Sequence, residues 1–408
     1  MLSSQIPEVY KDIRPYAEDE LPRVLAELMA DEQFLAAVTK VMPDVQDKVK
    51  AFMAAKPAFT NLDVQKVFIY PIVQHVIATC SEGIDLSIPD AFDRQQAHTF
   101  ITNHRDIVLD SAFLSFLLVE NQFPTTVEIA IGDNLLIYPW IKKLVRINKS
   151  FIVQRSLQMR EMLRASQVMS SYMHYAVDQK QENIWIAQRE GRAKDSDDRT
   201  QDSILKMMAM GGEGDVIDRL RQLHLTPMAL SYEYDPCDYL KATEFQQHRD
   251  VEDFRKSKAD DLRSMQTGIF GQKGHIHFEA APCIDAWLDS IDPSTPKTEL
   301  FHLIARHIDR EIHRSYRLYP SNLAAADLLY SASSGLPVRT SLSAPSTVPL
   351  STPEQRSAFE GYLAQRIDLA AQALQAEGLQ PDRPFLRERL LTMYANPVLN
   401  HRAACAQR

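Results

Sequence analysis

The stretch HTFITNHRDIVLDSAFLSFLL, residues 98–118, decides the fold class of this chain of 408 residues. It opens with a short β-rich run at 98–103 and continues, after a polar turn, into an apolar stretch at 111–118 with helical spacing. A strand that leads directly into a helix is the repeating unit of a sheet covered by helices.

The alternation of strand and helix continues as far as about residue 280. Further strands are predicted at 126–131, 151–154, 183–188, 228–234 and 275–279, with helical patterns between them at 157–179 and 199–210. Strands that alternate with helices form a sheet whose two faces are both covered. We therefore predict an α/β fold with a mixed, largely parallel sheet flanked by helices.

Helical patterns without strands flank this block as N- and C-terminal extensions. They lie at 22–57, 300–318, 323–329 and 354–394. We predict a helical N-terminal region at 1–82, an α/β domain at 83–280 and a helical C-terminal region at 281–408. Within the last region, the Ser/Pro-rich segment 331–353 is typical of a linker or mobile loop.

The composition argues against several classes of protein. With 45 Lys and Arg against 54 Asp and Glu, the net charge is −9, so nucleic acid is not an expected partner, although a local basic patch is compatible with this average. No apolar run reaches the ~18 residues of a membrane-spanning helix. The chain does not begin with a basic region followed by an apolar stretch, so a secretory signal is not expected either.

Metal and disulfide chemistry are not predicted. The four cysteines lie far apart and lack CxxC spacing, which fits a reducing cytoplasmic compartment without a zinc site or a disulfide framework. His275 and His277 alternate along one predicted strand, a spacing that could bind a metal, but no third ligand at a suitable spacing accompanies them. A structural or substrate-lining role is therefore favoured for both, and no cofactor is expected.

Polar side chains follow the predicted strands, where open α/β sheets carry their chemistry. His104 follows the first strand, with Asp106 and Asp110 two and six residues further on. This pattern suits a general base oriented by a carboxylate, or a simple surface hydrogen bond. Arg155 ends the third strand, and the basic turn REGRAK at 189–194 follows the fourth, so the two could form an anion cradle or a solvated loop.

Together, in this order, four segments resemble the glycerolipid acyltransferase family, the glycerol-3-phosphate and 1-acylglycerol-3-phosphate acyltransferases. NHRDIVLD (103–110) resembles Asn/Cys-His-Arg/Gln-Ser followed by Asp, and SFIVQR (150–155) resembles Gly-x-x-Phe-Ile-x-Arg. REGRAKD (189–195) looks like Glu-Gly-Gly/Thr-Arg-Ser, and PMALSYE (227–233) is similar to Pro-Val-x-Ile-x-Tyr-Glu/Asp. The resemblance covers roughly residues 98–240, about the size of one domain.

The resemblance implies the family's fold and its reaction. A fatty acyl group would move from acyl carrier protein or coenzyme A, as a thioester co-substrate, to the hydroxyl of glycerol-3-phosphate, by direct attack. A lysophosphatidate or lyso-aminolipid acceptor is the nearest alternative. A thioester hydrolase and a non-catalytic lipid-binding protein are the further alternatives.

The resemblance also implies a set of site residues. His104 would be the base and Asp110 its partner; the substrate would contact Arg105, Arg155, Glu190, Gly191, Arg192, Lys194, Pro227 and Tyr232. Two departures leave alternatives. Asp110 stands six residues after His104 where the family has five, so Asp106 competes for the partner role. The third motif lacks one small residue, so the phosphate role could fall to Arg192 or to Lys194.

The segment LLIYPWIKKLV at 135–145 combines aromatic and aliphatic residues with two lysines. This mixture suits a helix in a lipid interface, and it equally suits the edge of a core helix. With the implied lipid substrates, it predicts a peripheral protein on the inner face of the cell membrane.

Overall fold

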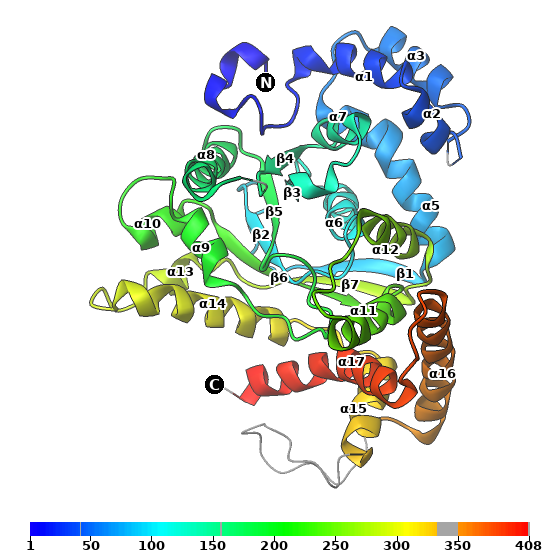
Figure 1. Cartoon of the computed structure of the whole chain (residues 1–408). Coiled ribbons are helices and arrows are strands. Elements are labelled where there is room, and N and C mark those ends of the chain that lie inside the picture. The colour runs from blue at the N-terminus through cyan, green and yellow to red at the C-terminus, as the bar shows by residue number, and fades with distance from the viewer. Residues whose placement is uncertain (41, 156, 333–349, 407–408) are drawn as a thin grey trace.

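The computed structural model describes residues 1–40, 42–155, 157–332 and 350–406. Within them, seven strands form one sheet in the order β1-β7-β6-β2-β5-β3-β4 (Figure 1). The strands are β1 (Gly83–Ser87), β2 (Thr99–Thr102), β3 (Val127–Gly132), β4 (Ser150–Val153), β5 (Asn183–Ala187), β6 (Leu225–Tyr232) and β7 (His275–Ala280). β6 and β7 are antiparallel, and the other neighbouring pairs are parallel. The predicted mixed, largely parallel sheet is therefore confirmed.

Each of the six predicted strands is present, because strands buried on both faces carry a continuous apolar signal. In β2 all four residues are buried, with Phe100 in the core on one face of the sheet and Ile101 in the core on the other. β1 is absent from the prediction. It is an edge strand that pairs with β7 alone, and its partly exposed residues give no such signal.

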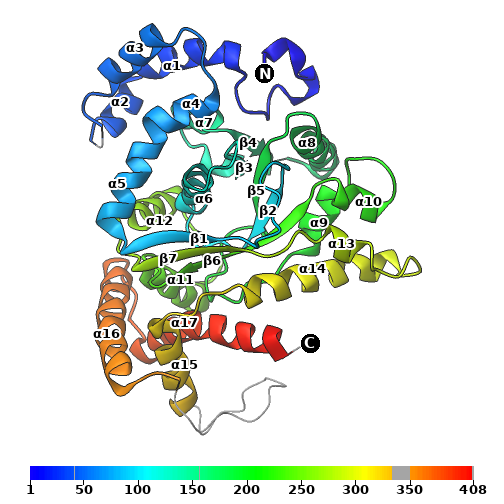
Figure 2. The same ribbon diagram turned by 180° about the vertical axis from the view of Figure 1, so that it is seen from behind.

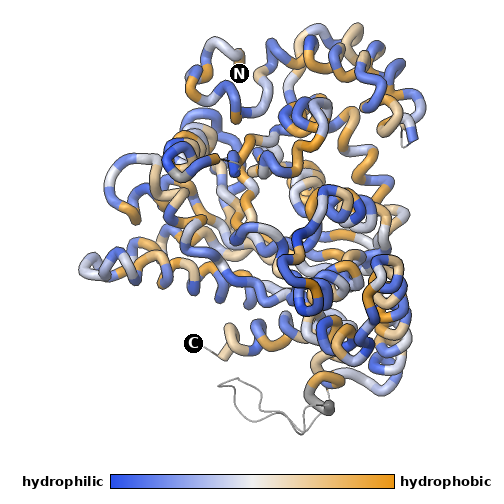
Figure 3. Tube along the Cα trace, in the orientation of Figure 1, coloured by the Kyte–Doolittle hydropathy of each residue, from blue (hydrophilic) through white to orange (hydrophobic). Residues whose placement is uncertain are grey.

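Helices cover both faces of the sheet (Figures 1 and 2). One face carries α5 (Tyr70–Cys80), α6 (Leu109–Glu120) and α12 (Lys258–Phe270), and the other carries α8 (Met159–Asp178), α9 (Asp202–Met208) and α14 (Lys297–Arg314). Along α14, hydrophobic and hydrophilic residues alternate (Figure 3), and Ile304, Ile308 and Ile312 are fully buried. Three further helices lie between strands, α7 (Pro139–Ile147), α10 (Val216–Arg221) and α11 (Asp238–Asp250), and α13 (Asp285–Leu288) follows β7.

The predicted helical extensions are present and lie at opposite ends of the molecule in both views. The N-terminal group comprises α1 (Leu21–Met29), α2 (Glu32–Val38), α3 (Val45–Ala55) and α4 (Asn61–Val64), and the C-terminal group comprises α15 (Pro320–Ala332), α16 (Pro353–Ala376) and α17 (Arg383–Ala406). Single turns of helix complete the chain: η1 (Ser3–Gln5), η2 (Glu8–Tyr10), η3 (Glu18–Glu20), the π-helical η4 (Gln65–Ile69) and η5 (Asp133–Leu135). Most of the predicted linker 331–353 lies outside the described residues.

The predicted helical segment 354–394 is divided into α16 and α17. The division occurs at Gly378, whose φ of 78° lies in the left-handed region that ends many helices. Leu379 N–H then donates to Leu374 O over 2.9 Å and closes the last turn. The periodicity continues across this break, which is why it predicted one segment.

Two helical glycines allow a matched test of packing. A Cβ at Gly268 in α12 would lie 1.9 Å from Asp106 Oδ2, whereas a Cβ at Gly361 in α16 meets no atom within 4 Å. Because alanine is the better helix former by ~1 kcal/mol, we expect Gly361→Ala to raise the free energy of unfolding by up to that amount. We expect Gly268→Ala to lower it by ~1–3 kcal/mol through overpacking. Urea unfolding followed by circular dichroism measures both, and equal stabilisation would contradict the packing described.

Candidate active site

The carboxyl ends of four parallel strands surround one cavity of about 660 Å³. His104 follows β2, Gly132 ends β3, Arg155 follows β4 and Trp185 belongs to β5, and all four line this cavity. This is the edge of an open α/β sheet at which ligands bind.

His104 is held by a carboxylate behind it. Its Nδ1 lies 2.7 Å from Asp110 Oδ2, and its side chain is 13% exposed. Because a carboxylate only accepts, Nδ1 carries the proton and Nε2 is the basic nitrogen. The edge of the His104 ring meets the Trp185 ring at a centroid distance of 5.5 Å, which further restricts its orientation.

Asp110 is fully buried and has donors on both oxygens. Oδ2 also accepts from the backbone N–H of Arg105 at 2.7 Å and of Asp106 at 3.1 Å, and Oδ1 accepts from Tyr232 Oη at 2.9 Å. Asp110 lies in the first turn of α6, where the helix dipole favours a negative charge. Tyr232, which the resemblance assigns to substrate binding, therefore contacts the carboxylate and does not line the cavity.

Asp106 makes different contacts. Its Oδ1 accepts from the backbone N–H groups of Val108 and Leu109 at 2.8 and 2.7 Å, just before α6 begins. Burial and the neighbouring Asp110 raise the pKa of Asp106. The extra residue between His104 and Asp110 is thus accommodated in a turn that Asp106 closes, and Asp110 alone of the two accepts from His104.

Asn103 anchors the segment to the neighbouring strand. Its side-chain amide donates to Leu230 O at 2.9 Å and accepts from Leu230 N–H at 2.7 Å, as a further residue of the β2–β6 ladder would. The next residue, His104, therefore leaves the sheet at a defined point.

The implied basic residues Arg155, Arg192 and Lys194 line the cavity together with Glu190 and Gly191. Gly191 has a φ of 69°, a conformation that suits glycine, and so the chain can turn back towards the cavity after Glu190. Arg155 Nη1 pairs with Glu190 at 3.0 Å near the surface, and Lys194 pairs with Glu244 of α11.

Arg192 is the more buried cation, and its Nη1 has no hydrogen-bond partner among the described residues. Burial acts to lower its pKa, but Cys237, Asp235 and Asp106 outweigh this and raise it, so the guanidinium stays charged.

Arg189, which the resemblance did not select, also lines the cavity and forms no ion pair with any described residue. Its position at the end of a predicted strand was the signal that could have identified it.

Besides Tyr232, two implied substrate contacts lie outside the cavity, Arg105 and Pro227. The Arg105 guanidinium donates to both carboxylate oxygens of Asp198, at 3.1 and 2.7 Å, in a buried pair. Although burial opposes it, Asp198 raises the pKa of Arg105. Pro227 lies within β6, beside Ile101 of β2, and its carbonyl accepts from Ala281 N–H. Both residues belong to motif segments, yet their contacts are within the fold. A position in a motif therefore does not ensure that a side chain faces the cavity.

Part of the lining of this cavity is apolar, and most of its residues lie outside the four motifs. It comprises Ile107, Val108, Ile129, Ile131, Leu135, Ile141, Val145, Phe245 and Met265. Ile141 and Val145 come from α7, whose Trp140 and Leu144 pack against the N-terminal helices instead. α7 is thus a core-edge helix with Tyr138 exposed at its start. Across the described residues, no helix combines the length and apolar character needed to cross a membrane.

The C-terminal region contacts the segment that follows the basic turn. Asn396 and Asn400 of α17 donate to Asp195 O at 2.8 Å and to Asp197 Oδ1 at 3.1 Å. His313 of α14 lies 2.8 Å from Asp198 O through Nε2. The helical extension therefore stabilises the loop that carries the cations.

No protein-family model and no curated protein matches the chain. Among solved structures, the chain is similar to the 1-acyl-sn-glycerophosphate (LPA) acyltransferase PlsC from Thermotoga maritima, at 10% sequence identity. The similarity covers 72% of this chain and 97% of that chain with a TM-score of 0.34. The sheet order and the helices on both faces define the fold class.

The buried Arg105–Asp198 pair gives a stability prediction. Asp198→Asn leaves a buried guanidinium without its countercharge, and we expect it to lower the free energy of unfolding by ~3–5 kcal/mol. Asp197→Asn is the matched control, because the Asp197 side chain is 42% exposed and the change should stay within ~0.5 kcal/mol. Guanidinium unfolding measures both, and similar effects would contradict the assigned role of Asp198.

Proposed function

We propose that this protein transfers a fatty acyl group from an acyl carrier protein or coenzyme A thioester to the hydroxyl of glycerol-3-phosphate. One observation carries the proposal. His104, oriented by Asp110, lines a cavity whose lining combines cationic and apolar side chains. A phosphorylated alcohol and an acyl chain need these two kinds of surface close to a base.

In the proposed reaction, His104 Nε2 takes the proton of the acceptor hydroxyl while that oxygen attacks the thioester carbonyl carbon. Asp110 stabilises the imidazolium that forms. The tetrahedral intermediate then breaks its carbon–sulfur bond, and the imidazolium returns the proton to the leaving thiolate. The products are an ester and a free thiol, and no acyl-enzyme is formed.

The arginines that line the cavity would hold the acceptor phosphate. The Arg155–Glu190 pair is partly solvent-exposed, and such pairs contribute only ~0–1 kcal/mol, so a phosphate can displace Glu190. Arg189 has no ion pair to break among the described residues. Guanidinium groups bind phosphate through two parallel hydrogen bonds, which would orient the hydroxyl towards His104.

The apolar part of the lining would take the acyl chain of the thioester. We propose that the exposed start of α7, with Tyr138, faces the inner surface of the cell membrane as a peripheral contact. The size of the cavity also supports a second acceptor, a lysophosphatidate or lyso-aminolipid, whose own chain would share this part of the lining.

His104→Ala is expected to reduce thioester-dependent acylation of glycerol-3-phosphate by ~10²–10⁴-fold, because the general base is lost. His275→Ala is the control, since His275 is exposed and does not line the cavity. Labelled ester and free thiol measure turnover, and circular dichroism checks the fold. Undiminished turnover would contradict the proposal, and free fatty acid without ester would indicate a hydrolase.

In the same assay, Asp110→Asn should lose activity while Asp106→Asn keeps most of it.

Arg189→Ala is expected to raise the KM for glycerol-3-phosphate by roughly 10- to 100-fold, the effect of one charged hydrogen bond. The KM for the acyl thioester should change little, and Arg189→Lys should restore part of the affinity. Arg402→Ala removes an exposed arginine of α17 and serves as the control. An unchanged acceptor KM in Arg189→Ala would show that the phosphate lies elsewhere.

A further inference from the structure

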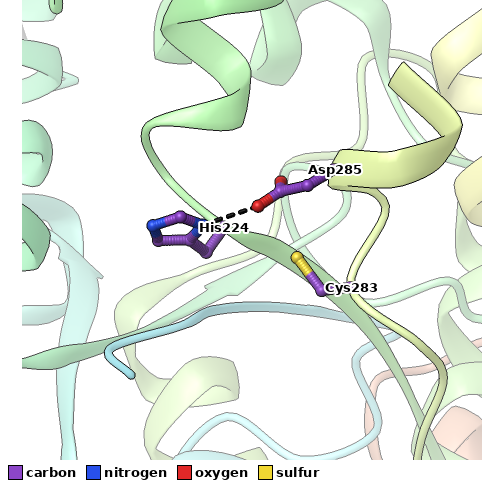
Figure 4. Close-up of side chains that lie close together, drawn as sticks. All are labelled: His224, Cys283 and Asp285. Carbon is purple, nitrogen blue, oxygen red and sulfur yellow. Dashed lines mark hydrogen bonds and ion pairs between the residues drawn. The ribbon is translucent and has the colours of Figure 1, made fainter. Parts of the chain in front are cut away.

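A second cluster of reactive side chains lies at the other end of the strands, where β6 begins and β7 ends. His224 immediately precedes β6, while Cys283 and Asp285 follow β7 (Figure 4). One potential ligand atom from each residue lies within 4.8 Å of the others. None of the three lines the cavity of His104.

The antiparallel pairing of β6 and β7 brings these residues together. The register pairs Met228 with Ala280, and beyond it Ala281 N–H donates to Pro227 O at 2.8 Å and Ile284 N–H to Leu225 O at 2.9 Å. The residue before β6 must therefore lie beside the segment that follows β7. The chain separation between His224 and Cys283 is why their spacing in the sequence predicted no metal site.

The side chains point towards one another. His224 Nδ1 lies 2.6 Å from Asp285 Oδ2, and Cys283 Sγ points towards the same space (Figure 4). The Asp285 side chain is 25% exposed, but its Oδ1 is buried and has no hydrogen-bond partner among the described residues. Burial and the neighbouring Asp285 raise the pKa of the Cys283 thiol to about 12, so the thiol keeps its proton until a metal displaces it. A cation bound in this space would pair with both groups.

The ligand set has the chemistry of a zinc site. Imidazole nitrogen, thiolate sulfur and carboxylate oxygen are the three ligand types that Zn²⁺ binds, and the two anions would balance its charge. With metal–ligand distances of about 2.0–2.3 Å, tetrahedral ligand atoms lie roughly 3.5 Å apart. Metal binding would therefore separate His224 Nδ1 from Asp285 Oδ2, which lie 2.6 Å apart, and bring the three ligand atoms from within 4.8 Å of one another to that spacing.

The neighbouring histidine His98 is not free to act as a fourth ligand. Its ring centroid lies 6.4 Å from that of His224, its Nδ1 3.0 Å from Thr226 Oγ1 and its Nε2 3.0 Å from Asp93 O. Both nitrogens are therefore already engaged. His224 and Asp285 line a separate cavity of about 760 Å³, from which water or a ligand can reach the site.

We propose that His224, Cys283 and Asp285 bind a divalent zinc-type cation that links the start of β6 to the segment after β7. Three protein ligands with an open position resemble catalytic zinc sites more than closed structural ones. The group Glu82, Glu233 and His275 is a less suitable alternative. It lacks a thiolate, and two of its three members are exposed.

Metal binding to the full chain tests this assignment. After chelation and dialysis, the wild-type chain should take up a single Zn²⁺, gain thermal stability, and show a thiolate-to-metal absorption band with Co²⁺. Cys283→Ser should remove that band and weaken Zn²⁺ binding by more than ~100-fold, because loss of an outer-shell partner alone costs roughly 10–100-fold. His224→Asn should weaken binding similarly, and asparagine tolerates the φ of 46° found there.

The controls separate this site from the others. His275→Ala and His104→Ala should bind Zn²⁺ like the wild type, because neither residue belongs to the proposed ligand set. If Cys283→Ser does not fold, Asp285→Asn takes its place, since an amide preserves the hydrogen bond to His224. The assignment is overturned if the wild type binds no stoichiometric Zn²⁺, if binding survives both ligand substitutions, or if His275→Ala is the variant that loses it.

Discussion

The Asp110 carboxylate is the constraint on which the rest of the site depends. A buried charge is stable only when donors surround it, and here they come from the His104 ring, two backbone N–H groups and Tyr232. The donors belong to the turn after β2 and the end of β6, and Asp110 itself to the start of α6, so all three segments must keep their places. The geometry of His104 is thus a consequence of satisfying one carboxylate.

The charges around the cavity fall into two layers with different physical roles. The Arg105–Asp198 and Lys241–Asp235 pairs are buried, and none of the four side chains meets solvent to an extent that would let an anion compete. Burial acts to raise the pKa of Asp235, yet Lys241 outweighs it and the pKa is lowered. Towards solvent, the Arg155–Glu190 pair is weak enough for an anion to compete. The buried pairs hold the backbone around the cavity in place, and the exposed pair leaves Arg155 able to bind an anion.

Much of the fold could be predicted because its strands and helices follow from local patterns of apolar and turn residues. The six predicted strands are buried on both faces or lie beside such strands, and their apolar runs are short and separated by turns. The candidate site was predictable where a residue directly follows such a strand, as His104 and Arg155 do. It was not predictable for Arg105, whose neighbour in the sequence faces the cavity while it faces Asp198. Adjacent side chains point in different directions, and a sequence motif does not show which of them faces the cavity.

The sequence by itself determined the α/β class, the strand ends that carry polar residues, and the helical regions on either side, because periodicity and turn residues act over a few positions. Only the tertiary structure decided that Asp110 pairs with His104 while Asp106 closes a turn. It alone placed His224 beside Cys283, and brought apolar side chains and cations into the lining of one cavity. These choices depend on burial and on pairing between distant segments, and a carboxylate or a thiol acquires its role only from the neighbours that folding supplies.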